Sequence, residues 1–222
     1  AASVFVDVPL AACQDLVEAL PRGLAPLASQ VRLDGTLSLQ SSVRFDTARP
    51  KAAEVQWKLS NGCRVKSVAP AVSPDRFRAP FTLEVPDEHA VFVQRAFGPG
   101  TPNWTAMVDM SAHLSRAVLV CEDGGFYHHN GFDAQAIRNS IRENLVQGRF
   151  ARGASTVSMQ LAKNLYLRRE KTFSRKLQEA VLTVLLEQSF TKDELMELYL
   201  NVVELGPGIY GVGEASRLYF NT

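Results

Sequence analysis

The sequence has no stretch of about 18 consecutive apolar residues, the length that a membrane-crossing helix needs. Its first ten residues also lack the basic start and the long apolar core of a secretory signal peptide. We therefore predict no membrane-spanning helix within these residues. Because the chain begins without Met and stops just after an apolar helical pattern, we expect a fragment of a longer protein whose anchor lies elsewhere.

Cysteine is scarce, and Cys13, Cys63 and Cys121 are far apart. Their spacing matches neither a metal site nor an even set of disulfides. Cys121 lies in an apolar run, where we expect a buried free thiol. The cysteines leave the cellular compartment open.

Excess charge of either sign is absent as well, with 24 Lys and Arg against 23 Asp and Glu. A chain without a basic field disfavours nucleic acid as its partner, so any affinity for an anion must come from local clusters of Arg and Lys. With 222 residues and 46% hydrophobic content, the chain is long enough to bury a sizeable core.

The first half of the chain shows the two-residue period of β-strands. Between about residues 31 and 93, apolar side chains occupy alternate positions, which are Val31, Leu33, Leu37, Leu39, Val43, Phe45, Val55, Trp57, Leu59, Phe81, Leu83 and Val85. Asn61-Gly62 predicts a tight hairpin between 55–60 and 63–68, and Asp34-Gly35 indicates another turn. Residues 11–20 predict a short helix that ends at Pro21. We expect a small antiparallel β module.

After the Gly- and Pro-rich stretch 98–102, the period becomes helical. Ser111 and Asp133 are expected to cap two helices, and Thr191 with Glu194 forms a capping box for another. An apolar stripe predicts one more helix and consists of Phe173, Leu177, Val181, Val184 and Leu185. The fold class is therefore α+β, with a β-rich module of unknown role over 1–104 and a mostly helical domain over 105–222.

The segment 121–133 places Glu122 and Asp123 at the end of an apolar helix, before glycines and histidines. Such a segment suits the wall of a cleft, although a solvated helix end explains the same residues. A zinc site at His128-His129 is less well supported, because adjacent histidines lack the helical spacing of ligands and no third ligand is evident.

Two further segments carry polar groups suited to binding. Residues 152–164 combine glycine, hydroxyls, an amide and Lys163 at the start of a predicted helix, where backbone N–H groups suit a phosphate or a sugar. Arg175 and Glu179 are four residues apart on a helix, which by itself indicates an exposed ion pair.

Taken in order, these segments resemble the glycosyltransferase domain of penicillin-binding proteins and monofunctional transglycosylases, the family 51 glycosyltransferases. The matching motifs are E-D-x-x-F-x-x-H-x-G at 122–131, G-x-S-T-x-x-x-Q at 153–160, R-K-x-x-E at 175–179, K-x-x-x-x-E-x-Y-L-N at 192–201 and G-x-G-x-x-G with Y-F at 206–220. The resemblance covers about residues 105–222 and implies a lysozyme-like domain, incomplete at its C-terminus here.

The resemblance implies Glu122 and Glu179 as the catalytic carboxylates, on opposite walls of one cleft. It implies a set of substrate-binding residues, which are Asp123, Phe126, His129, Arg152, Ser155, Thr156, Gln160, Lys163, Asn164, Lys171, Arg175 and Lys176. This sequence departs from the family at Met159, where a second glutamine is usual, and at Lys171, where an arginine is usual. Met cannot replace the hydrogen bonds of an amide, and Lys loses the two-pronged grip of Arg on phosphate.

The implied reaction polymerises the lipid-linked disaccharide-peptide precursor, lipid II, into glycan strands with inversion and release of lipid pyrophosphate. Glu122 takes the proton of the acceptor hydroxyl, Glu179 stabilises charge at the donor carbon, and cations hold the pyrophosphate. No cofactor is required, although Mg²⁺ could bridge the pyrophosphate. The expected partners are the precursor, the growing glycan strand, other cell-wall synthesis proteins and the membrane surface, on the periplasmic face of the cytoplasmic membrane. Phe126, Tyr127 and Phe150 are candidates for membrane contact, with core packing favoured for Phe126.

Two alternatives stay open. A lysozyme-like hydrolase would use Glu122 as an acid to cut glycan, but it has no pyrophosphate to hold and no need of Lys163 and Lys171. A weakened or inactive domain, disabled at Met159 or by truncation, would only bind envelope components.

Overall fold

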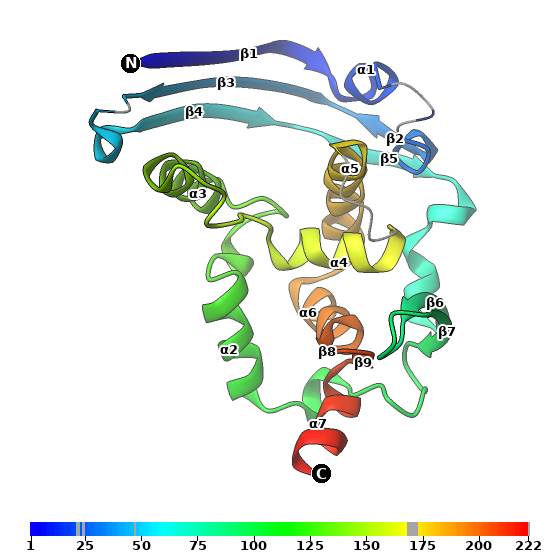
Figure 1. The fold of residues 1–222 in the computed structure, drawn as a ribbon. Coiled ribbons are helices and arrows are strands. Elements are labelled where there is room, and N and C mark those ends of the chain that lie inside the picture. Colours follow the sequence, from blue (N-terminus) through cyan, green and yellow to red (C-terminus); the bar gives the residue numbers. More distant parts are fainter. Residues whose placement is uncertain (21–22, 24, 47, 168–172, 222) are drawn as a thin grey trace. The chain divides into compact units, whose positions relative to one another are not determined.

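The computed structural model describes residues 1–20, 23, 25–46, 48–167 and 173–221, and contacts within the chain divide it into two units. Unit 1 comprises residues 1–68 and 132–155, and unit 2 comprises residues 69–131 and 156–222. The fold class is α+β, as predicted. Most strands come early in the chain and most helices come later (Figure 1).

Unit 1 contains a three-stranded antiparallel sheet in the order β1-β3-β4 (Figure 1). Its strands are β1 (Ala2–Ala12), β3 (Thr36–Phe45) and β4 (Glu54–Asn61). Strand β1 was not predicted, although Val4, Val6, Val8 and Leu10 alternate along it. Its alternation was missed because it lies before the predicted module and because much of its apolar surface stays exposed.

A second pair of strands in unit 1 consists of β2 (Val31–Asp34) and β5 (Arg64–Val68). Val31 and Leu33 are buried, which confirms the predicted alternation. Helix α1 (Cys13–Glu18) packs against β2 and matches the predicted short helix, and α3 (Ala134–Gln147) packs against β4.

The predicted hairpin at Asn61-Gly62 is wrong. Strand β4 pairs with β3, while β5 pairs with β2, so the chain passes from one sheet to the other at this point. Neither Asn61 nor Gly62 has the positive φ that the predicted turn needs. Gly62 instead lies against Gly35, where a Cβ added to Gly35 would come within 2.0 Å of the Gly62 carbonyl oxygen. Gly35 has a φ of +87° and does turn the chain, from β2 into β3.

The prediction for the cysteines is also wrong. Cys13 and Cys63 form a disulfide that joins the start of α1 to the connection between β4 and β5, across 50 positions of sequence. Only the pairing of distant strands brings these two residues together, so their spacing in the sequence gave no signal. Cys121 is a free thiol but is exposed, because the face of its helix that carries it is not covered.

Unit 2 contains five helices and two short antiparallel strand pairs among its described residues. The helices are α2 (Ala112–Glu122), α4 (Val157–Tyr166), α5 (Phe173–Ser189), α6 (Lys192–Val202) and α7 (Val212–Phe220). The strand pairs are β6 (Phe81–Pro86) with β7 (Phe92–Phe97) and β8 (Glu204–Gly206) with β9 (Ile209–Tyr210). Helices α4, α5 and α6 pack together and supply most of the fully buried side chains.

The predicted helix caps are confirmed. The Ser111 side chain accepts a hydrogen bond at the start of α2, and the Asp133 side chain does so at the start of α3. Thr191 and Glu194 form the capping box of α6, in which each side chain accepts from the other residue's backbone N–H. These bonds satisfy N–H groups that have no partner inside the helix.

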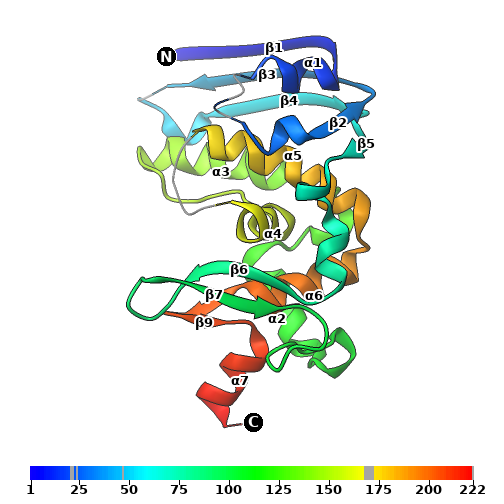
Figure 2. The same cartoon turned by 90° about the vertical axis from the view of Figure 1, so that its right-hand side faces the viewer.

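Residues 69–111, which precede α2, belong to unit 2. Figure 2 shows β6 and β7 of this segment next to β9. The Phe77 ring is buried and meets the Tyr166 ring of α4 edge to face, with the ring centres 5.2 Å apart. The Tyr210 hydroxyl of β9 donates to the Pro86 carbonyl of β6 at 2.9 Å. Among the described residues, no helix is both long and apolar enough to span a bilayer.

Candidate active site

Glu122 is the last residue of α2, and its side chain is exposed. The helix ends there because Asp123 leaves helical geometry, with a φ of −160°. The Glu122 Oε2 atom accepts a hydrogen bond of 2.9 Å from Nε2 of Gln160, on α4. An accessible carboxylate held by an amide can receive a proton from a substrate hydroxyl.

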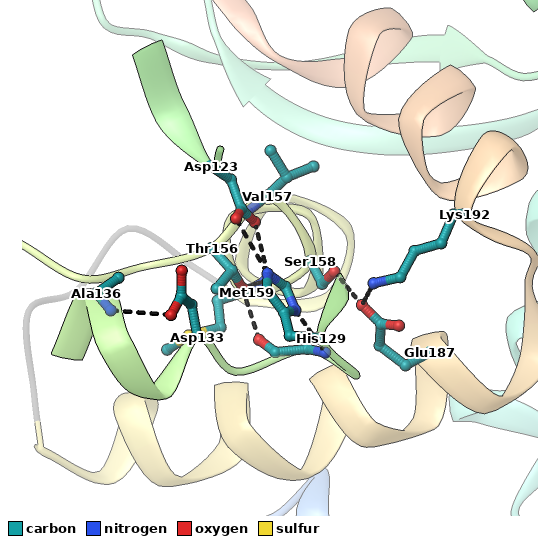
Figure 3. Close-up of polar contacts among 11 residues, drawn as sticks. Asp123, His129, Asp133, Ala136, Thr156, Val157, Ser158, Met159, Glu187 and Lys192 are labelled. Carbon is teal, nitrogen blue, oxygen red and sulfur yellow. Dashed lines mark hydrogen bonds and ion pairs between the residues drawn. The ribbon is translucent and has the colours of Figure 1, made fainter. Parts of the chain in front are cut away.

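Asp123 is buried and links three parts of the site (Figure 3). Its carboxylate accepts from the backbone N–H of Val157, the first residue of α4, at 2.9 Å and lies 3.0 Å from Nε2 of His129. The Gly131 N–H donates to Nδ1 of His129 at 3.1 Å, so in this tautomer Nε2 carries the proton and donates to Asp123. The negative charge of Asp123 thus lies at the N-terminus of α4, where the helix dipole favours it.

Thr156 links the N-terminus of α4 to the loop that follows α2 by two hydrogen bonds. Its hydroxyl accepts from the Met159 N–H at 3.2 Å and donates to the Gly131 carbonyl at 2.7 Å (Figure 3). Gly131 has a φ of +92°, and a Cβ there would come within 2.6 Å of a methyl group of Thr183. Thr156 and Asp123, both predicted to bind substrate, are therefore bonded within the protein and position α4.

Phe126 is fully buried, in agreement with its predicted core packing. The ammonium of Lys192 lies 4.4 Å from the centre of the Phe126 ring and forms an ion pair of 2.8 Å with Glu187. The Ser158 hydroxyl also donates to Glu187 (Figure 3). This network ties α4, α5, α6 and the 126–129 turn together.

Sequence reasoning did not identify Ser158 or Glu187 as part of the site. A weak signal existed, because Ser158 falls on the apolar face of α4 and Glu187 directly follows the buried Leu185 and Leu186. Polar groups at buried helix positions need partners, and each of these two supplies one for the other.

Gln160, Lys163 and Asn164 share one face of α4, because residues three and four positions apart lie above one another on a helix. All three are partly exposed, whereas the opposite face is buried. Lys163 and Asn164 line a pocket of about 230 Å³, with strand β6 on its other side. The structure thus brings Gln160 to Glu122 and places the cation and second amide farther along the same face.

Glu179 is buried, with 2% of its surface exposed, and is bound by two cations of its own helix. Arg175 lies 3.0 Å from one carboxylate oxygen, and Lys176 pairs with the other. The predicted ion pair is therefore present but buried rather than exposed. Two cations against one carboxylate give this group of side chains a net positive charge, which suits an anionic substrate.

The remaining predicted residues divide between unit 1 and the part of the chain outside the structure. Arg152 and Ser155 belong to unit 1. There the Asn144 side chain accepts from the Arg152 N–H at 2.9 Å and donates to its carbonyl at 3.0 Å, while the Arg152 side chain is exposed. Lys171 lies outside the described residues.

Met159, where the family usually has glutamine, is buried on α4 with 7% of its surface exposed. Of the aromatic residues considered for membrane contact, Tyr127 is 46% exposed and Phe150 is 81% exposed. Among the residues that the structure describes, no group of three or more His, Cys, Asp or Glu side chains could hold a metal ion.

Comparison with known proteins agrees with the family resemblance of the second half of the chain. The family model described as transglycosylase matches residues 92–222. The biosynthetic peptidoglycan transglycosylase of Nitrosomonas eutropha is 48% identical over 117 residues, which is 53% of this chain and 48% of the relative. That of Dechloromonas aromatica is 44% identical over 119 residues, covering 54% and 52%, and that of Alcanivorax borkumensis is 43% identical over 137 residues, covering 61% and 56%.

The chain spans about half the length of the curated relatives that it matches. The matched region includes every residue predicted to act in the site, from Glu122 to Glu179. Since the family model covers more than half of the chain, the chain belongs to the transglycosylase family.

Proposed function

We propose that this chain carries the catalytic residues of a peptidoglycan glycosyltransferase. The protein would polymerise the lipid-linked disaccharide-peptide precursor, lipid II, into glycan strands and release lipid pyrophosphate. The observation that carries the proposal is the exposed carboxylate of Glu122, bonded to Gln160 on the same face of α4 as Lys163 and Asn164. The base on α2 is thus bonded to the face of α4 that carries the cation.

In the proposed reaction, Glu122 accepts the proton of the 4-hydroxyl of the acceptor sugar. The hydroxyl oxygen forms a bond to the anomeric carbon of the donor as the bond from that carbon to the pyrophosphate breaks. The electron pair of the broken bond leaves with the pyrophosphate. Attack from the side opposite the leaving group inverts the anomeric centre.

Lys163 is the cation that we assign to the departing pyrophosphate, because stabilising charge that develops in the transition state lowers the barrier. Arg175 and Lys176, with Glu179 between them, form a second charged group in unit 2, and Lys171 and Arg152 are further candidates. We assign Glu179 to the positive charge that develops at the donor carbon. The protein itself needs no metal in this scheme, and a Mg²⁺ ion would enter with the pyrophosphate of the substrate.

We place the reaction in the cell envelope, at the periplasmic face of the cytoplasmic membrane. The Cys13–Cys63 disulfide supports a compartment outside the cytosol, because reducing conditions keep most cytosolic thiols unpaired. The exposed Tyr127 and Phe150 side chains are candidates for contact with the membrane that holds the precursor. The growing glycan strand is the second substrate, and other cell-wall synthesis proteins are candidate partners.

The experiment that tests the proposal offers the full-length protein two substrates in parallel, the lipid-linked precursor and preformed glycan. We expect polymer to form from the precursor and no shortening of the glycan. Cleavage of glycan without polymerisation would instead show a hydrolase. Binding of the precursor with no turnover would show a domain that has lost the activity.

A further inference from the structure

The hydroxyl of Tyr199 lies inside unit 2, next to the amide of Gln160. Tyr199 is on α6 and only 3% of its surface is exposed. Its hydroxyl is 3.4 Å from Oε1 of Gln160, at the long end of hydrogen-bond distances. Burial and the nearby charge of Glu122 raise the pKa of Tyr199 to about 12, so at neutral pH the hydroxyl keeps its proton.

Gln160 connects Tyr199 to Glu122 through the two ends of one amide group. Its oxygen faces the Tyr199 hydroxyl, and its nitrogen donates to Oε2 of Glu122 at 2.9 Å. If the amide turned over, its oxygen would face the Glu122 carboxylate, and two acceptors would repel each other. The hydroxyl donor on α6 therefore favours the same amide orientation that Glu122 requires.

The side chain of Glu122 has little else to hold it. It is exposed at the end of α2, and among the described residues its second oxygen, Oε1, accepts no hydrogen bond. A bond to Oε2 that keeps the carboxylate in one orientation leaves Oε1 available for the acceptor's proton. Orientation of a base within hydrogen-bond reach of its proton is a large part of its effect on rate.

We propose that Tyr199 is a positioning residue for Glu122 that acts through the amide of Gln160. This inference rests on the proposed function, because it assigns to Tyr199 a role in the reaction of that same site. Tyr199 itself does not touch the substrate in this scheme. Its hydroxyl fixes the amide, and the amide fixes the base.

The test compares four forms of the full-length protein in polymerisation of the lipid-linked precursor: wild type, Tyr199→Phe, Gln160→Ala and the double variant. We expect Tyr199→Phe to lower kcat about tenfold with KM within about twofold, because the base is misplaced while substrate contacts remain. Since Tyr199 acts through Gln160, the double variant should be no slower than Gln160→Ala alone.

Tyr210→Phe is the matched control. Tyr210 is also 3% exposed, and its hydroxyl donates to the Pro86 carbonyl rather than to Gln160. Each Phe variant loses one buried hydroxyl, so their melting temperatures should fall by similar amounts, whereas kcat should fall for Tyr199→Phe and stay within about twofold for Tyr210→Phe.

Three results would overturn the inference. Unchanged kcat in Tyr199→Phe, with an active wild type, would show that the hydroxyl does not position the base. Multiplying losses in the double variant would show that Tyr199 acts independently of Gln160. A wild type that makes no polymer would remove the proposed function, and this inference with it.

Discussion

Glu122, Asp123 and Glu179 are three carboxylates with three different surroundings. Glu122 is exposed and receives one hydrogen bond from an amide. Asp123 is buried and bonded to His129 and to the start of α4. Glu179 is buried between Arg175 and Lys176. Of the three, only Glu122 combines solvent access with an open acceptor position among the described residues, which is why we assign the base to it.

Met159 is the residue at which this chain departs from its family inside the described site. Since it is buried, we expect Met159→Gln to place an amide where it has no partner and to lower the free energy of unfolding by about 1–3 kcal/mol. Thermal unfolding of the variant and the wild type measures this. Raised polymerisation with an unchanged melting temperature would instead show that position 159 faces substrate. The effect of Lys171 on precursor binding stays a prediction.

At the scale of elements, the helices were the easiest part of the fold to predict. Ser111, Asp133, Thr191 and Glu194 are local signals, because a cap bonds to residues two or three positions away. The strand pairing was harder, since the partners of β4 and β5 are set by contacts between distant segments. Asn61-Gly62 fits a hairpin locally, yet its strands belong to different sheets.

The motifs named Glu122 and Gln160 as site residues, and the structure brings these two side chains together, while their roles in the reaction stay predictions. The candidate site was not predictable where a residue acts through a contact that the sequence does not show. Tyr199 looks like an ordinary core aromatic on an apolar helix face, and Glu187 like a solvated charge near a helix end. Their roles depend on which side chains the packing of α4, α5 and α6 brings beside them.

The start of α6 gives a prediction with a pH dependence. Partial burial opposes ionisation of Glu194, but hydrogen bonds from Thr191 and Arg78 outweigh it and hold the pKa of Glu194 below its usual 4.5. A lowered pKa in the folded state stabilises the protein above the unfolded pKa, and this stabilisation is lost as pH falls through the folded value. We expect Glu194→Gln to be less stable than wild type by about 0.5–1 kcal/mol at pH 7.

The difference in stability between Glu194→Gln and the wild type should shrink as the pH is lowered from 5 to 3. Unfolding by denaturant at each pH measures it. Arg78 and Glu194 are each partly exposed to solvent, so added salt should also reduce this difference in stability. A difference that stays constant over this pH range would show that the charge of Glu194 contributes nothing.

At the scale of the whole molecule, residues 69–91 precede the region that the family model matches, yet they pack against the helices of unit 2. Residues 69–91 belong to unit 2 and contact α4, α6 and β9 through Phe77, Arg78 and Pro86. The boundary near residue 105 was predicted from a change of period and a Gly- and Pro-rich stretch, and it stays a prediction about independent folding. The role of residues 1–68 is open, since none of the motifs falls within them.

Phe77 tests the membership of this segment in unit 2. We expect Phe77→Ala to destabilise unit 2 by about 3–5 kcal/mol, because it removes a buried ring that packs on Tyr166. Phe92→Ala, at a ring that is 52% exposed, is the control and should cost much less. Equal small losses in unfolding by denaturant would mean that the segment contributes little to the stability of the helices.

The central claim concerns the chemistry of Glu122, and its most direct test is the rate of glycan polymerisation by Glu122→Gln in the full-length protein. The amide has nearly the same shape but cannot accept the hydroxyl proton, so we expect a melting temperature close to that of wild type and a rate lower by about 10²–10⁴. A rate within about tenfold of wild type, from a folded variant, would contradict the account and remove Glu122 from the role of base.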